Sequence, residues 1–159
     1  MLVFTIVSAF KGNGINGNKL SIKAQIGNWQ KGDKFNLLRA TISLTNNTDD
    51  TIAYRSMSCS SDDFYETNIN VLTVQVQSCL SDYQILEKIP PHTTQQKKLN
   101  LQTDLLISRM YGIKFRLGFY FIQEHDSFNK SDFITHPDYY SQYLIYSDDI
   151  EITYKSHVE

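Results

Sequence analysis

The chain has 159 residues, of which 41% are hydrophobic and 20% are charged. This is the size and composition of one ordinary globular domain and not of a disordered chain. The formal net charge is only −2, so no dominant basic surface points to nucleic acid as a partner. The two cysteines form no CxxC pair, which argues against a zinc site, and we expect no metal and no cofactor.

The first ten residues, Met1–Phe10, are uncharged and mostly apolar. They fit either the hydrophobic part of a secretory signal or a first β-strand, and they are too few to span a bilayer as a helix. We therefore divide the chain into residues 1–14, a signal remnant or first strand, and residues 15–159, a single domain. No other stretch of the sequence approaches the length of a transmembrane helix.

Alternation of apolar and polar residues with a period of two, which marks half-buried strands, dominates the first half. It predicts strands over Lys19–Ile26 and Leu37–Thr45. The Asn- and Asp-rich stretch Asn46–Asp50 is typical of a turn, so we predict a hairpin between Leu37–Thr45 and a return strand over Thr51–Met57. Ser58–Asn70 is polar and predicts a loop.

The second half continues the pattern. Further strands are predicted over Val71–Gln77, Tyr83–Ile89 and Gln95–Leu101, and Pro90-Pro91 ends the second of these because proline cannot donate to a ladder. Leu105–Met110 predicts a helical turn or a crossover between sheets.

The clearest strand is Gly112–Gln123, with one face formed by Ile113, Phe115, Leu117, Phe119 and Phe121 and the other by Lys114, Arg116 and Gly118. His125–Gln142 is a long polar and aromatic connection, and Leu144–Tyr154 is a last strand with a bulge or kink at Asp148-Asp149. These seven to eight strands predict an all-β fold, an Ig-like antiparallel β-sandwich of the Greek-key type.

Cys59 and Cys79 are predicted to form a disulfide. In the chain-entropy model it stabilises the folded state by about 3 kcal/mol. The alternative is a pair of free, buried thiols in a cytosolic protein. An oxidised pair favours the cell envelope or the exterior, since disulfides persist in oxidising compartments.

Several of these segments resemble a known class of domain. The run Leu38–Ile52, the cysteine segments Met57–Cys59 and Ser78-Cys79, and the aromatic strand Lys114–Gln123 together resemble small Ig-like domains of unknown function in bacterial envelope and secreted proteins. The same pattern is similar to the intracellular proteinase inhibitor fold of bacilli. The resemblance covers residues 36–154 and carries over no functional residue. It departs from the antibody pattern because Trp29 precedes both cysteines, which lie close together.

Catalytic motifs are few. The sequence has no GxSxG, HExxH or Gly-rich phosphate loop, and its histidines, His92, His125, His136 and His157, lie in predicted loops or the tail. The carboxylate pairs Asp49-Asp50, Asp62-Asp63 and Asp148-Asp149 lack the EF-hand spacing. We therefore expect no enzyme.

The best candidate binding residues are aromatic. Tyr139, Tyr140 and Tyr143 lie in the long connection after the strand Lys114–Gln123, where exposed tyrosines could stack on sugars or anchor a protein. Their alternative role is to pack down and pin the loop. Trp29, in a predicted Gly-flanked turn, is either a surface anchor or a packing residue.

These observations favour a non-enzymatic binding or structural module of the bacterial envelope or exterior, with a protein or carbohydrate as its partner. The alternative is a protein that inhibits a protease through a projecting loop. The sequence leaves the ligand and the oligomeric state open.

Overall fold

The computed structural model describes residues 19–76 and 79–154. Within them the chain forms eleven strands, and every strand pairing is antiparallel. Residues 1–14, for which we predicted a signal remnant or a first strand, lie outside the described residues. So does His157.

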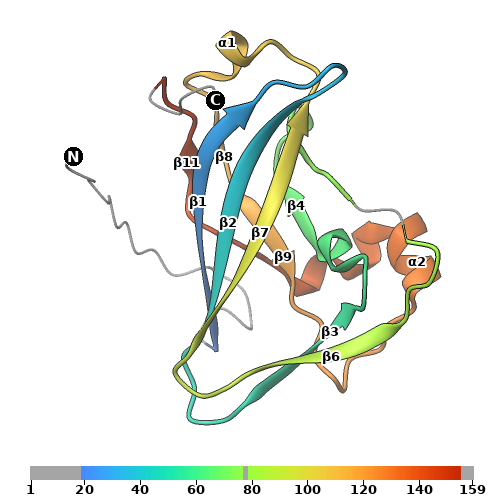
Figure 1. Ribbon diagram of the computed structural model, residues 1–159. Helices are drawn as coiled ribbons and strands as arrows, with labels where there is room; N and C mark the ends of the chain where they lie inside the picture. The colour runs from blue at the N-terminus through green and yellow to red at the C-terminus, as the bar shows by residue number, and fades with distance from the viewer. Residues whose placement is uncertain (1–18, 77–78, 155–159) are drawn as a thin grey trace.

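The largest sheet has four strands in the order β1 (Leu20–Gln30), β2 (Asn36–Asn46), β7 (Thr94–Thr103) and β5 (Thr73–Val74). In Figure 1 its three long strands lie in front of the remaining β-structure. The alternation that predicted β1 and β2 is visible in their burial, because the apolar set Leu38, Ala40, Ile42 and Leu44 faces the core.

The other strands form three small sheets. A three-stranded sheet has the order β10 (Leu144–Tyr146), β9 (Leu117–Tyr120) and β4 (Tyr65–Thr67). The pairs are β11 (Ile150–Glu151) with β8 (Lys114–Phe115), and β3 (Ile52–Met57) with β6 (Gln84–Ile89). Short helices connect them: η1 (Ser61–Phe64), α1 (Ile107–Met110), α2 (Lys130–Thr135) and η2 (Pro137–Tyr143).

The core lies between the large sheet and the strands behind it. Phe119 of β9 contacts the rings of Tyr65 and Tyr54 at centroid distances of 5.0 and 5.3 Å, and all three side chains are buried. The predicted all-β antiparallel sandwich is confirmed, and residues 19–76 and 79–154 alone contain eleven strands where seven to eight were predicted. The immunoglobulin-like, Greek-key topology stays a prediction.

The predicted hairpin between Leu37–Thr45 and Thr51–Met57 is wrong. β2 pairs with β1 and β7, whereas β3 pairs with β6. The segment between β2 and β3 is therefore a corner at which the chain leaves one sheet for another, and β6 and β7 turn the same corner in the opposite direction (Figure 1).

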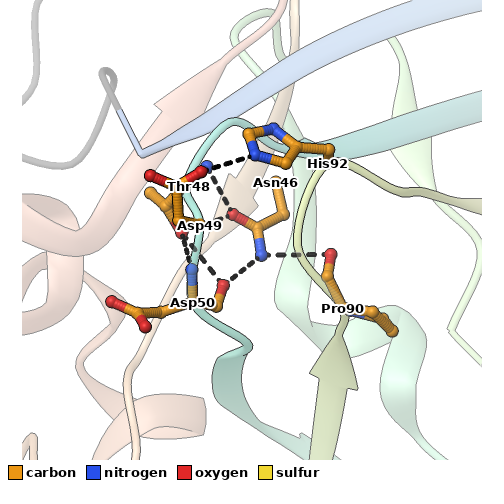
Figure 2. Close-up of polar contacts among 6 residues, drawn as sticks. All are labelled: Asn46, Thr48, Asp49, Asp50, Pro90 and His92. Atoms are coloured by element: carbon orange, nitrogen blue, oxygen red, sulfur yellow. Dashed lines mark hydrogen bonds and ion pairs between the residues drawn. The ribbon is translucent and has the colours of Figure 1, made fainter.

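The side chain of Asn46 holds this corner together (Figure 2). Its amide nitrogen donates to the backbone carbonyls of Asp50, Ile89 and Pro90 at 2.7, 2.9 and 3.1 Å. Its amide oxygen accepts from the backbone N–H and the hydroxyl of Thr48 at 2.9 and 2.8 Å. Asn46 has no exposed surface. Its one buried amide therefore provides hydrogen-bond partners for backbone groups of both segments that turn at this corner.

Two further predictions require correction. Ser58–Asn70 is not only a loop, because it contains η1 and β4 and buries Phe64 and Tyr65. Gly112–Gln123 is not one amphipathic strand: β8 and β9 are separated at Arg116, and residues 117–122 are buried on both faces.

The remaining elements agree more closely with expectation. α1 is the helical turn predicted within Leu105–Met110. The last predicted strand is interrupted between β10 and β11, where the kink at Asp148-Asp149 was expected. β5 covers only two residues of the strand predicted over Val71–Gln77, whose last residue lies outside the described part.

Candidate functional site

The long connection after β9 folds into two short helices. Asn129 is the N-cap of α2, and its side chain accepts a hydrogen bond from the backbone N–H of Ser131 at 2.9 Å. Pro137 opens η2, a position at which the missing N–H costs nothing. The connection predicted over His125–Gln142 is therefore a small helical layer on the β-structure.

Most aromatic rings of this layer point inward. Phe133 of α2 stacks on Phe64 at 5.1 Å and meets the edge of Tyr120 at 5.0 Å. Tyr140 lies beside Phe133 at 5.3 Å, and its hydroxyl accepts from the backbone N–H of Asn129 at 3.0 Å. Tyr140 is only 8% exposed, so it pins η2 to α2, which is the packing role considered for these rings.

Tyr139 points the other way. Its side chain is 70% exposed, and its ring lies parallel to that of His136 with centroids 5.2 Å apart and an interplanar angle of 7°. The exposed Ile134 lies just before this pair in the chain. We call the stacked pair of His136 and Tyr139 the aromatic surface of the helical layer.

The other predicted residues lie elsewhere. Tyr143 is half-buried beside Tyr140, with ring centroids 6.2 Å apart, and burial raises the pKa of its phenol. Trp29 has no exposed surface and belongs to β1 and not to a turn. The structure therefore gives Trp29 the packing role and leaves no surface for an anchor.

A buried carboxylate attaches the start of α2 to the disulfide. Cys59 and Cys79 are joined as expected, with their Cα atoms 6.2 Å apart. Asp82 accepts from the backbone N–H of Cys59 at 3.0 Å and from the Lys130 ammonium at 2.7 Å, and it also accepts from the Ser60 hydroxyl.

The Asp82 side chain is only 6% exposed. Burial by itself raises the pKa of this carboxyl, but the hydrogen bonds from Lys130, Ser60 and the backbone hold it well below its ordinary value. Asp82 thus connects the disulfide to the helical layer as a permanently charged group at neutral pH.

A second carboxylate lies on the face of the three-stranded sheet opposite to the Phe119 ring. Glu66 of β4 accepts hydrogen bonds from the hydroxyls of Tyr120 and Tyr146. Burial, followed by the hydrogen bond to Glu66, raises the pKa of both phenols well above the ordinary value. Both tyrosines therefore remain donors. The Arg116 guanidinium lies 4.7 Å above the Tyr146 ring.

The histidines and carboxylate pairs form local contacts. His92 contacts Asp49 at 2.8 Å, and His125 lies 3.9 Å from Asp126. Asp62 pairs with Lys97 at 2.9 Å. Across residues 19–76 and 79–154, no group of three or more His, Cys, Asp or Glu side chains is placed to hold a metal ion. None of the helices in the same part of the chain is long and apolar enough to cross a membrane.

The sequence did not predict the stack of His136 on Tyr139 or the two bonds to Glu66. The sequence did contain a signal for the stack of His136 on Tyr139, because Pro137 marks the start of a helical turn and residues three apart on such a turn share a face. The hydrogen bonds to Glu66 had no such signal, because they depend on the pairing of β4, β9 and β10, which are far apart in the sequence.

Comparison with known proteins adds one structure. No family model matches the chain, and no curated protein matches it. A crystal structure of the Bacillus subtilis protein YcdA, described as a "putative lipoprotein", is similar over 91% of this chain and 39% of that chain, with 9% identity and a TM-score of 0.43. The chain thus spans well under half of that protein.

Proposed function

We propose that this protein is a non-enzymatic binding module of the bacterial envelope or exterior, and that its partner docks on the aromatic surface of the helical layer. The observation that carries the proposal is the exposed ring of Tyr139, stacked on His136 beside rings that are buried. An exposed tyrosine supplies contact area with little loss of side-chain freedom.

The residues around Tyr139 are held by hydrogen bonds, ring contacts and an ion pair, and this supports a binding role. Tyr140, its neighbour in the chain, is held by its hydroxyl at Asn129 and by the ring of Phe133. Lys130, one turn before Ile134, is fixed to Asp82. A preorganised surface loses less entropy on binding.

The placement outside the cytoplasm rests on the disulfide. Cys59 and Cys79 are bonded, and such bonds persist in oxidising compartments. The intact mass of the protein from its native host, measured under non-reducing conditions, tests this placement. We expect the mass to lack two thiol hydrogens, and a reduced chain in the native host would remove the argument for export.

Photo-crosslinking tests the docking surface directly. With a benzophenone amino acid at position 139, expressed in the native host, we expect one specific covalent adduct whose partner is identified by mass spectrometry as a protein or a glycan. The matched control places the same group at position 154, where Tyr154 is 82% exposed and its ring lies beside that of Tyr111, which follows α1. Equal adducts at both positions, or none at position 139, would contradict the proposal.

A further inference from the structure

The outward face of the four-stranded sheet has an unusual charge distribution. The chain contains 17 Asp and Glu residues, and none of them belongs to β1, β2, β5 or β7. The four strands therefore contribute no carboxylate to this face, although the protein has a net charge of −2.

Three cations lie on this face. Lys23 of β1, Arg39 of β2 and Lys98 of β7 are all exposed. Lys98 is paired with Thr41, two residues from Arg39, and Lys23 is paired with Ser43. With the usual strand spacing and rise per residue, the three Cα atoms are roughly 8 to 14 Å apart.

Lys97 shows that a lysine in β7 does not by itself add a cation to this face. Lys97 and Lys98 are adjacent, but successive residues of a strand point to opposite faces. Lys97 points inward and binds Asp62 at 2.9 Å and the Ser61 hydroxyl at 2.6 Å. Only Lys98 remains on the outward face, with Lys23 and Arg39.

Hydroxyl and amide groups surround the cations on this face. Cross-strand pairs join Thr45 with Thr94 at 2.8 Å, Ser43 with Gln96 at 3.4 Å and Gln75 with Asn100 at 3.3 Å. Each of these groups retains further donor or acceptor capacity. No outward-facing position of these four described strands holds an aromatic ring.

We propose that this face, the polar sheet face, binds an acidic polysaccharide. Its cations complement the anionic groups of the polymer, and its hydroxyl and amide groups match the hydroxyls of the sugar rings. An extended polymer fits an open sheet face. Nucleic acid is disfavoured, since single strands bind largely through bases stacked on aromatic rings, which this face lacks.

The test measures binding of the full chain to polygalacturonate, with neutral dextran and single-stranded DNA as comparison polymers. We expect binding to polygalacturonate that weakens as salt is added, and little binding to dextran. The triple variant Lys23→Gln, Arg39→Gln, Lys98→Gln should bind polygalacturonate at least tenfold more weakly. Thr41→Val, which removes one hydroxyl at nearly constant volume, should weaken binding about threefold.

A matched triple variant distinguishes the effect of cations on this face from the effect of net charge alone. Lys34, Lys88 and Arg109 are exposed and lie outside the four strands, so changing all three to Gln alters the net charge equally. We expect its affinity to stay within twofold of the wild type. An equal loss in both triple variants, or equally tight binding to DNA, would overturn the proposal in favour of nonspecific ion exchange.

The proposal is independent of the aromatic surface. Tyr139→Ala should leave the affinity for polygalacturonate unchanged, because Tyr139 lies in η2 and outside the four-stranded sheet. Loss of polygalacturonate binding in this variant would assign the polymer to the aromatic surface and overturn the assignment to the sheet.

Discussion

The ring of Tyr146 fills the space that a side chain at Gly118 would occupy. Tyr146 and Gly118 are paired across β10 and β9, and a Cβ at position 118 would lie 2.8 Å from Tyr146 Cε1 and 2.8 Å from Leu144 Cδ1. Glu66 is paired with Gly118 on the other side. The missing side chain lets Tyr146 reach across the middle strand to Glu66.

Gly118→Ala should therefore destabilise the protein by about 1–3 kcal/mol, as is typical of overpacking. The Tyr146 ring cannot move aside freely, because Glu66 and Arg116 hold it. Urea unfolding followed by the fluorescence of Trp29, the single tryptophan, measures the free energy of unfolding.

Gly27→Ala is the control for this substitution. At Gly27 the nearest atom to a new Cβ is Arg39 Cβ at 3.6 Å, which is an ordinary contact. Its free energy of unfolding should stay within about 0.5 kcal/mol of the wild type. Equal effects of the two substitutions would contradict the role given to Gly118.

The corner between β2 and β3 gives a second prediction. Asn46→Ala removes the buried hydrogen bond to the Ile89 carbonyl and the part-buried bonds to the carbonyls of Asp50 and Pro90. Loss of the partner of a buried polar group costs about 1–3 kcal/mol. We expect a total loss of about 3 kcal/mol in urea unfolding. Asn47→Ala, at the exposed neighbour, should change stability by less than about 0.5 kcal/mol, so a comparable loss there would refute the assignment.

The same corner shows what the sequence could and could not predict. Alternation is local, so it located β1 and β2 and the polar residues of the turn at Asn46–Asp50. It could not identify the partner of each strand, because the bonds that bend the chain join Asn46 to carbonyls 43 and 44 residues away. The turn was therefore interpreted as the end of a hairpin.

The helical layer was missed for a different reason. Its helices are too short to show a helical period, and only the N-cap Asn129 and Pro137 marked their starts. The candidate site was consequently predicted only as a cluster of tyrosines. Which of them is exposed depends on how η2 lies on α2, and neither composition nor spacing determines that.

Asp82 predicts a dependence of stability on pH. Its folded-state pKa lies below the unfolded value of about 3.9. Its contribution to stability is therefore complete above about pH 5 and is lost as the pH falls through the unfolded value towards the folded one. In Asp82→Asn this contribution is absent at every pH.

Urea unfolding of wild type and Asp82→Asn at a series of pH values tests this. We expect the wild type to be more stable at pH 7 and the difference to shrink steadily below pH 4. Asp63 nearby has a raised pKa, chiefly through burial, and the charge of Asp82 is one of the smaller causes, so most of this shift is present in both proteins. A difference that stays constant with pH would show that Asp82 contributes no charge-dependent stability.

Tyr139 and Tyr140 should respond in opposite ways to the same substitution. If both rings formed a binding site, Tyr139→Ala and Tyr140→Ala would each weaken binding and leave stability nearly unchanged, whereas packed rings would be needed for the fold. The structure separates them, because Tyr139 is 70% exposed and Tyr140 only 8%. Tyr140→Ala removes ring contacts with Phe133 and the acceptor for the Asn129 N–H, so it should cost about 3 kcal/mol.

Tyr139→Ala should change the free energy of unfolding by less than about 0.5 kcal/mol, and it should abolish the adduct formed when the benzophenone group is moved to position 134. Tyr140→Phe keeps the ring and removes only the hydroxyl, so it should lose about 1 kcal/mol and retain the adduct. If Tyr139→Ala instead unfolds the protein, the ring belongs to the fold and the aromatic surface is not a docking site.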